Sequence, residues 1–380
     1  MLSNPLSYGS TLFYYFYDCL NFMETQIKEF LIKLKHPALN EEFISEKSVK
    51  KINVHEELIE INLKLDFHDD KNKDEIKNII TEYVKNTFSK KTKIEIATEI
   101  KNHKVQSNLS PMQGIKNIIA VASGKGGVGK SSVSVNLAIA LSKLGASVGI
   151  LDADIYGPSQ PMMLGVNKKP DSKDGRSMEP IDINGIQVMS IGFLVDQETP
   201  MIWRGPMVTG TLEQLLKETN WKNLDYLIID LPPGTGDIQL TLAQKIPLTG
   251  AIIITTPQDI ALLDARRGLK MFEKVRVPIL GIVENMSTHI CSKCGHEEHI
   301  FGQNGGTKMA KDYNIELLGS LPLDIVIREK LDNGKAFELH EEQTQIAKNF
   351  YSIALKTAFN ISKLGVDLQS KFPKIVIEKN

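Results

Sequence analysis

The chain has few cysteines and no excess of charge of either sign. Its three cysteines, Cys19, Cys291 and Cys294, are too few for a disulfide scaffold and suit a reducing compartment such as the cytoplasm. The 45 basic and 46 acidic residues leave a net charge of −1, which gives no support for a nucleic-acid or polyanion binder. No apolar run reaches about 18 residues, so we expect neither a membrane-spanning helix nor a membrane partner.

The composition is otherwise typical of a folded protein. Hydrophobic residues make up 42% of the chain and charged residues 24%, which excludes collagen-like, fibrous and disordered proteins. At roughly 100–200 residues per domain, 380 residues predict two or three domains.

The first 22 residues carry an aromatic run at 12–17. No basic segment precedes this run and no small-residue cleavage site follows, so we predict no signal peptide. An interfacial anchor is one interpretation. We favour a mis-assigned start, with Met23 as the initiator, and treat residues 1–23 as an uncertain extension.

Residues 24–101 are predicted to form a small α+β domain. Helical spacing of apolar residues predicts helices at 26–34 and 74–88, and alternation predicts strands at 58–65 and 94–97. Residues 102–114 lack periodicity and contain serine, asparagine and proline, so they are predicted to be a linker.

Residues 115–360 are predicted to form one large α/β domain, followed by a tail at 361–380. Apolar runs of strand length recur at 118–122, 147–151, 227–229, 251–255 and 279–283. Because these runs alternate with helix-length segments, we expect a mainly parallel sheet with helices on both faces. An amphipathic helix at 340–358 is expected to pack on this core.

A glycine-rich segment that begins at Gly124 fits the phosphate-binding pattern G-x-x-x-x-G-K-[ST]. It follows an apolar strand and opens a helix at 131–144 that ends before Gly145, which is the context that the pattern requires. We expect Lys130 to reach the β- and γ-phosphates and the Ser131 hydroxyl to bind Mg²⁺. The predicted nucleotide contacts of this loop are Gly124, Lys125, Gly126, Gly127, Val128, Gly129, Lys130, Ser131 and Ser132.

Acidic residues follow two of the predicted strands. Asp154 is the candidate that orients the attacking water, and Asp152 is expected to hold a metal-bound water or the loop. Asp230 ends an apolar strand in the Walker B manner and is predicted to face Mg²⁺. The turn that follows, up to Asp237, has two prolines and two glycines, as a phosphate-sensing switch requires, and Asp237 is a further predicted nucleotide contact. Each carboxylate taken alone is also consistent with a helix N-cap.

Asn285 follows a late strand, at the place where P-loop proteins of this kind often recognise adenine. The guanine-binding sequence Asn-Lys-x-Asp is not found there, since the run is Asn-Met-Ser-Thr. We therefore expect ATP rather than GTP.

Cys291 and Cys294 form a C-x-x-C pair, a spacing shared by zinc, redox and iron–sulfur sites. A zinc site with His296 and His299 is conceivable, although these histidines are closer than the usual spacing. Two thiolates do not complete a four-cysteine shell, whereas a two-fold dimer supplies four. Four thiolates suit a [4Fe–4S] cluster as well as zinc, so the residues alone leave iron–sulfur, zinc and no metal open.

Together these motifs resemble the Mrp/ApbC family of iron–sulfur cluster carrier ATPases. The resemblance covers about residues 110–360 and is carried by the segments 123–132, 152–159, 203–207, 230–237, 284–286 and 291–294. It implies a cytoplasmic homodimer that binds a labile [4Fe–4S] cluster between Cys291 and Cys294 of both chains. It also implies slow ATP hydrolysis with Mg²⁺, and transfer of the cluster to apo-proteins.

The loop also resembles the "deviant" Walker A of dimeric P-loop ATPases, because Lys125 is a second lysine within it. This resemblance implies that Lys125 crosses the dimer interface to the partner's nucleotide and acts like an arginine finger. Lys125, Lys130, Asp154 and Asp230 are thus the candidate catalytic residues. The rival interpretation is a related ATPase with structural zinc that acts in partitioning or positioning on DNA or membrane.

Residues 24–101 resemble the MIP18-like (DUF59) domain in length and in the order of elements. They lack its Asp-Pro-Glu turn, with His36-Pro37-Ala38 in its place, and they contain no cysteine. These departures argue against a cluster-handling role for this domain, and the simpler interpretation is a docking or stabilising domain.

Overall fold

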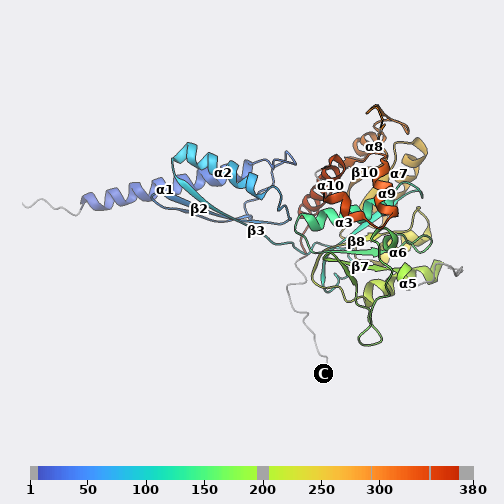
Figure 1. The fold of residues 1–380 in the computed structure, drawn as a ribbon. Coiled ribbons are helices and arrows are strands. Elements are labelled where there is room, and N and C mark those ends of the chain that lie inside the picture. The colour runs from blue at the N-terminus through green and yellow to red at the C-terminus, as the bar shows by residue number, and fades with distance from the viewer. Residues whose placement is uncertain (1–6, 195–204, 292, 342–343, 368–380) are drawn as a thin grey trace, which may run out of the picture. The chain divides into compact units, whose positions relative to one another are not determined.

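The computed structural model describes residues 7–194, 205–291, 293–341 and 344–367, with the backbone alone over 7–19. The chain divides into two compact units, Met1–Ile100 and Lys101–Asn380, and each is described by itself (Figure 1). Trp203 and Arg204, which contributed to the family resemblance, lie outside the described residues.

The first unit is a three-stranded sheet with two helices. Its central strand β2 pairs antiparallel with β1 and parallel with β3. Every second side chain of β2 is buried, so one face of the sheet forms the core. The rings of Phe30 and Tyr83 stack at 3.6 Å and join the two helices. The elements are α1 (Ser7–Lys33), β1 (Val49–Val54), β2 (Leu58–Leu65), α2 (Lys73–Phe88) and β3 (Lys91–Thr98).

The predictions for this unit were correct for β2 and nearly so for α2. They missed β1, whose pairing with β2 has an irregularity between Val49 and Lys51 that breaks the alternation expected of a strand. The helix predicted to start at residue 26 begins at Ser7, so the helical backbone continues through Met23.

A buried polar pair, His36 and Asp69, holds the turn at His36-Pro37-Ala38, the segment that stands in place of an Asp-Pro-Glu turn. His36 Nε2 donates to Asp69 Oδ2 at 2.7 Å, and both residues are 1% exposed. The His36 Nδ1 atom accepts from the backbone N–H groups of Ala38 and Leu39 at 3.1 and 3.3 Å. Because Nδ1 is an acceptor, the ring proton lies on Nε2, where it faces the carboxylate.

The second unit is built on an eight-stranded sheet in the order β13-β10-β9-β4-β8-β5-β7-β6. All neighbouring strands are parallel except β6 and β7. A small antiparallel hairpin lies apart from this sheet and pairs β11 (His289–Ile290) with β12 (Glu297–Glu298). The strands of the large sheet are β4 (Ile115–Ser123), β5 (Val148–Asp152), β6 (Ile181–Ile183), β7 (Ile186–Ser190), β8 (Leu224–Asp230), β9 (Gly250–Thr255), β10 (Ile279–Glu284) and β13 (Leu317–Ser320).

The expectation of a parallel sheet is confirmed. The five predicted strands are β4, β5, β8, β9 and β10, which lie next to one another in the sheet and are buried along almost their whole length. The predictions missed β6, β7 and β13. These strands are short and lie toward the two edges, where continuous apolar runs are not needed.

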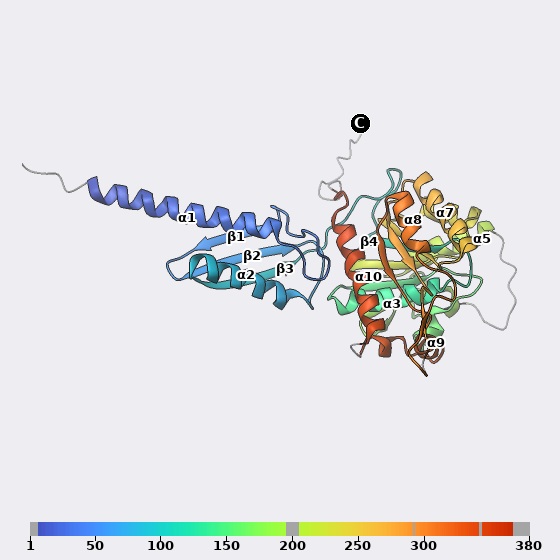
Figure 2. The same cartoon turned by 90° about the horizontal axis from the view of Figure 1, so that it is seen from above.

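Helices cover both faces of this sheet, as expected (Figure 2). Helices α3 (Lys130–Lys143) and α10 (Gln345–Ser362) pack together on one face. The other face carries α5 (Gly205–Glu218), α6 (Asp237–Lys245), α7 (Asp259–Lys274) and α8 (Gly305–Tyr313). Right-handed crossovers explain this division, because the chain moves across the sheet in opposite directions after β4 and after β8. Two shorter helices, α4 (Gln160–Met163) and α9 (Ile325–Asp332), complete the unit.

The segment predicted as a linker packs against the second unit. The buried Gln106 side chain donates to the carbonyls of Ala243 and Ile246 at 2.8 and 3.2 Å and accepts from the Leu248 N–H at 3.1 Å. Within the described part of the chain, none of the helices combines the length and apolar character that a bilayer crossing needs.

Candidate functional site

The candidate nucleotide residues meet at the carboxyl edge of the sheet. Asp152 ends β5, Asp230 ends β8, and the two are direct neighbours in the parallel register. The glycine-rich loop follows β4, and Asn285 follows β10. The carboxyl edge of an open parallel sheet is where such folds bind ligands.

The backbone of the glycine-rich loop explains its sequence. Gly127 and Gly129 have φ of +81° and +82°, a left-handed conformation that side chains disfavour. A Cβ atom on Gly124 would lie 2.2 Å from the carbonyl carbon of Asp264 in α7, so only glycine fits there. Helix α3 starts immediately after the loop, and its N-terminus favours an anion.

Lys130 lies beside three other predicted site residues, which are Asp154, Asp230 and Ser131. Its side chain is 5% exposed and donates from Nζ to Asp230 Oδ1 at 2.6 Å and to Ser131 Oγ at 3.1 Å. Asp154 Oδ2 lies 3.6 Å from the same nitrogen. The lysine is thus held beside the carboxylate predicted to face Mg²⁺.

Asp230 has two further partners that the sequence analysis did not identify. Its Oδ1 accepts from Ser134 Oγ at 2.9 Å, and its Oδ2 accepts from Gln160 Nε2 at 3.0 Å. Ser134 lies one helical turn after Lys130, a spacing that predicts the same helix face. No sequence spacing indicated Gln160, because it lies next to Asp230 only in the folded chain.

Asp152 holds the loop that leads to α4, which is one of the two roles predicted for it. Its Oδ2 accepts from the backbone N–H groups of Ser159 and Gln160 at 3.0 and 3.1 Å and from Ser190 Oγ at 3.0 Å. Burial, together with the nearby charge of Asp230, raises the pKa of Asp152 to about 7.

Asp154 is largely buried, and burial raises the pKa of its carboxyl, although the charge of Lys130 opposes this shift. Among the described residues, neither Asp154 Oδ1 nor Gln160 Oε1 has a hydrogen-bond partner. Buried acceptors of this kind require donors, such as bound water. Ser131 and Asp230 supply hard oxygen atoms beside them, and this donor set fits a hydrated Mg²⁺ ion.

The other residues that were predicted to contact the nucleotide lie at several separate places around the glycine-rich loop. Asn285, expected to contact adenine, donates from Nδ2 to the carbonyl of Val128 at 2.9 Å and so fastens the loop. Lys125 is exposed and has no side-chain partner among the described residues. Ser132 lies in the first turn of α3, and Asp237 is an exposed residue at the start of α6.

The predicted switch turn is tied to the strand before the loop. The Gly234 N–H donates to the carbonyl of Ser123 at 2.9 Å, and Ser123 Oγ donates to the carbonyl of Lys125 at 2.9 Å. Gln239 Nε2 donates to the carbonyl of Pro233 at 2.5 Å. These hydrogen bonds connect the turn to the glycine-rich loop through Ser123.

The two candidate metal-binding cysteines lie in the connection of the β11–β12 hairpin. Both are free; Cys294 is exposed and Cys291 half-buried. The Cys291 N–H donates to the carbonyl of His296 at 2.9 Å, which closes the connection. Hydrogen bonds from the backbone N–H groups of Lys293 and Cys294, and from the Cys294 thiol, lower the pKa of the Cys291 thiol.

The single-chain zinc set considered from the sequence does not assemble. Among the described residues, no group of three or more histidine, cysteine or acidic side chains is placed to hold a metal ion. His299 Nδ1 instead donates to the carbonyl of Ser287 at 2.9 Å.

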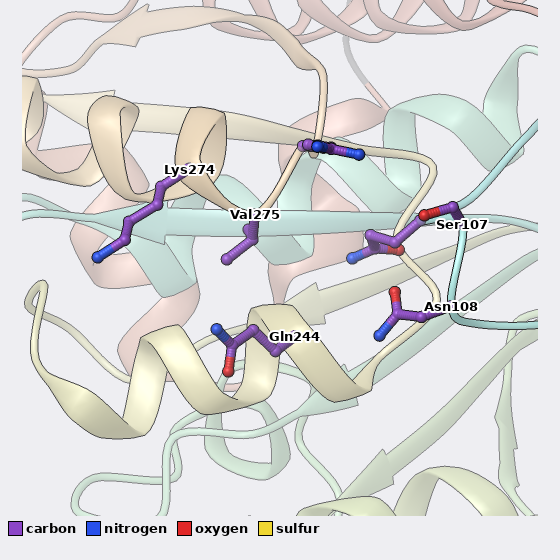
Figure 3. A pocket seen from close by; sticks show the side chains of 7 residues that line it. Ser107, Asn108, Gln244, Lys274 and Val275 are labelled. Atoms are coloured by element: carbon purple, nitrogen blue, oxygen red, sulfur yellow. The ribbon is translucent and has the colours of Figure 1, made fainter.

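A surface pocket of about 340 Å³ lies elsewhere on the second unit and contains none of the predicted site residues (Figure 3). Gln244 comes from α6, Lys274 and Val275 from the end of α7, and Ser107 and Asn108 from the segment before β4. Because α6 and α7 lead into β9 and β10, the pocket is at the amino edge of the sheet.

Comparison with known proteins agrees with the site geometry. Residues 114–358 match the family described as NUBPL iron-transfer P-loop NTPase. An "iron-sulfur cluster carrier protein" from Haemophilus influenzae is 50% identical over 360 residues, which cover 94% of this chain and 97% of that protein. An "iron-sulfur cluster transfer protein NUBPL" from Dictyostelium discoideum is 45% identical over 297 residues, 77% of this chain and 92% of that protein.

A solved structure shows the same fold. The nucleotide-binding protein from Archaeoglobus fulgidus, in complex with ADP, is 38% identical and aligns with a TM-score of 0.55. The alignment covers 63% of this chain and 93% of that protein.

Proposed function

The chain belongs to the family of NUBPL iron-transfer P-loop NTPases, and on this premise we propose that it is an ATP-dependent iron–sulfur cluster carrier that delivers a labile cluster to apo-proteins. The observation that carries the proposal is the placement of the C-x-x-C pair. Asn285 fastens the glycine-rich loop, and the same segment continues into the hairpin that presents Cys291 and Cys294. A cluster bound there lies on a chain segment that starts at the nucleotide site.

The chain's own residues suit ATP hydrolysis. Lys130 is positioned to exchange the Asp230 carboxylate for the phosphates, which releases Asp230. Ser131 and Asp230 would then hold Mg²⁺, which supplies charge neutralisation at the phosphates. Asp154 has a carboxylate oxygen without a hydrogen-bond partner among the described residues, with which it would orient the attacking water, and burial raises the pKa of this carboxyl. A preference for ATP and a slow rate of hydrolysis belong to the same proposal.

In this proposal a homodimer completes both the cluster site and the nucleotide site. Two thiols per chain are half of a four-thiolate shell for a [4Fe–4S] cluster, so the cluster would bridge two copies. The exposed Lys125 has no partner among the described residues of its own chain and would reach the neighbouring nucleotide. Exposed apolar side chains lie near both sites, with Ile260 and Leu263 on α7 and Ile290 on the hairpin. They provide apolar area for such an interface.

The first unit is proposed to be a MIP18-like docking or stabilising domain. Its sheet and helices form a small α+β domain, as that resemblance requires, and residues 24–101 contain no cysteine. A cytoplasmic location is part of the same proposal, since free thiols are maintained in a reducing compartment.

Anaerobic reconstitution with iron and sulfide tests the cluster proposal. We expect broad absorption near ~400 nm and about four irons per two chains, as a four-cysteine cluster requires. The matched control is the Cys291→Ser/Cys294→Ser variant, which should bind no cluster. Tightly held zinc with no cluster in the wild-type protein would overturn the carrier proposal and favour the zinc-containing partitioning ATPase.

A further inference from the structure

We propose that Gln160 is a positioning residue of the Mg²⁺–nucleotide site, with its carboxamide oxygen accepting a hydrogen bond from water bound to the metal. The inference rests on the proposed nucleotide function, and it concerns a residue that no sequence motif identifies. Three observations carry it: the fixed place of the side chain, the orientation of its amide and the unpaired oxygen.

The place of Gln160 is fixed from both ends. Its backbone N–H donates to Asp152 Oδ2 at 3.1 Å, which anchors the start of α4 to the end of β5. Its side-chain Nε2 donates to Asp230 Oδ2 at 3.0 Å and to the carbonyl of Ser131 at 3.1 Å. The residue is 0% exposed. The side chain therefore joins the two residues predicted to hold Mg²⁺.

The orientation of the amide follows from the chemistry of its neighbours. An aspartate carboxylate and a backbone carbonyl are both acceptors, so the NH₂ group must face them. The oxygen is then directed to the other side of the same planar group. A flipped amide would place oxygen against oxygen at both contacts and leave the NH₂ group without these acceptors.

The oxygen is left without a donor. Gln160 Oε1 is buried and has no hydrogen-bond partner within the described ranges, and the same holds for Asp154 Oδ1. A buried amide oxygen without a donor is unfavourable. Mg²⁺ bound to a nucleotide usually keeps several water molecules, and each is a strong donor. An amide whose nitrogen already contacts Asp230 and Ser131 is positioned to accept from this hydration shell.

The alternative is that Gln160 only supports Asp230. Ser134 provides the matched control, because its hydroxyl donates to the same carboxylate at 2.9 Å and adds no unpaired acceptor. If support of Asp230 were the whole role, Ser134→Ala and Gln160→Met would have the same effect. If the amide oxygen also acts on the metal's water, Gln160→Met reduces the response to Mg²⁺ more than Ser134→Ala does.

The experiment is calorimetric titration of the full chain with ADP, once with Mg²⁺ and once with EDTA. We expect Gln160→Met to bind ADP in EDTA within about twofold of wild type. The tightening produced by Mg²⁺ should fall about 10-fold or more, the usual loss when an outer-shell partner of a metal is removed. Ser134→Ala should lose clearly less of that tightening, because it removes one donor to Asp230 and no acceptor for the metal's water.

Two results would overturn the inference. One is an unchanged Mg²⁺-dependent gain in Gln160→Met, and the other is an equal loss in Ser134→Ala. Thermal melting without nucleotide shows whether each variant folds, and Gln160→Leu is the second variant if the methionine is not tolerated. Failure of the wild-type chain to bind ADP in either buffer would instead count against the nucleotide proposal itself.

Discussion

Asn285 donates a hydrogen bond from its side-chain amide to the backbone carbonyl of Val128, 2.9 Å away and 157 residues earlier in the chain. Both residues are buried. A Cβ atom on Gly129 would lie 2.2 Å from the same amide nitrogen, so the asparagine rests directly against the loop. The bond connects the phosphate loop to the segment that carries the cysteines, and the first prediction concerns it.

Replacement of Asn285 by alanine should weaken nucleotide binding about 5- to 10-fold, because a net hydrogen bond worth about 1 kcal/mol no longer holds the loop. If the amide acts on the loop, the affinities for ATP and GTP fall together. Titration of both nucleotides measures this. A loss confined to ATP would contradict a loop-holding role and assign the side chain to adenine.

Replacement of Lys130 by methionine should abolish ATP hydrolysis and also destabilise the fold. Asp230 is fully buried beside Lys130 Nζ, and removal of one partner of a buried pair costs about 3–5 kcal/mol of unfolding free energy. The Lys130→Met/Asp230→Asn double variant should recover most of this stability in urea unfolding while it stays inactive. A double variant no more stable than Lys130→Met would show that the pair does not couple.

Replacement of Lys125 by alanine should leave stability and nucleotide affinity nearly unchanged, because the side chain is exposed and forms no hydrogen bond or ion pair with a described residue. Hydrolysis should nevertheless fall about 10³-fold, the effect of losing a cation in trans. Mixing Lys125→Ala with Lys130→Ala chains provides the decisive assay. Each mixed dimer would contain one intact site, so activity should reappear on mixing; its absence would refute the trans role.

Replacement of Cys291 by serine should prevent cluster binding while the fold is maintained. The residue lies on a surface hairpin, so the free energy of unfolding should change by less than about 0.5 kcal/mol. Iron content after reconstitution and a thermal melt measure the two effects. A fully loaded Cys291→Ser protein would rule out the bridging arrangement.

Replacement of His36 by alanine should destabilise the first unit by about 3–5 kcal/mol, because Asp69 is left buried without the ring N–H. His55→Ala is the matched control, since its imidazole is 57% exposed and lies 3.8 Å from Glu60. Urea unfolding of the full chain should resolve an early transition in the His36 variant alone. Equal stability of the two variants would contradict a structural role for the buried pair.

The parts of the structure that were predictable are those determined by local sequence. Continuous apolar runs indicated the five central strands, because a strand buried on both faces needs apolar residues throughout. The glycine-rich loop was recognisable because its positive φ angles and close backbone approach admit little but glycine.

The parts that were missed depend on the tertiary fold. Strand β1 contains an irregularity near Lys51 that hides its alternation. Gln160 and Ser134 become site residues only because β5, β8 and α3 converge on Asp230. The spacing of His296 and His299 after the cysteines left a zinc site open, and only the three-dimensional arrangement shows that these side chains do not gather.

The cysteines sit on a hairpin whose two strands contain two residues each. So short a ladder has little free energy with which to hold its shape, and we expect it to open far more readily than the sheet behind it. If the proposed cluster is bound there, its cysteine ligands can be replaced one at a time by an incoming thiolate without disturbing the rest of the protein. A rigid four-cysteine site would retain a bound cluster, whereas a short hairpin of this kind favours transfer of the proposed cluster.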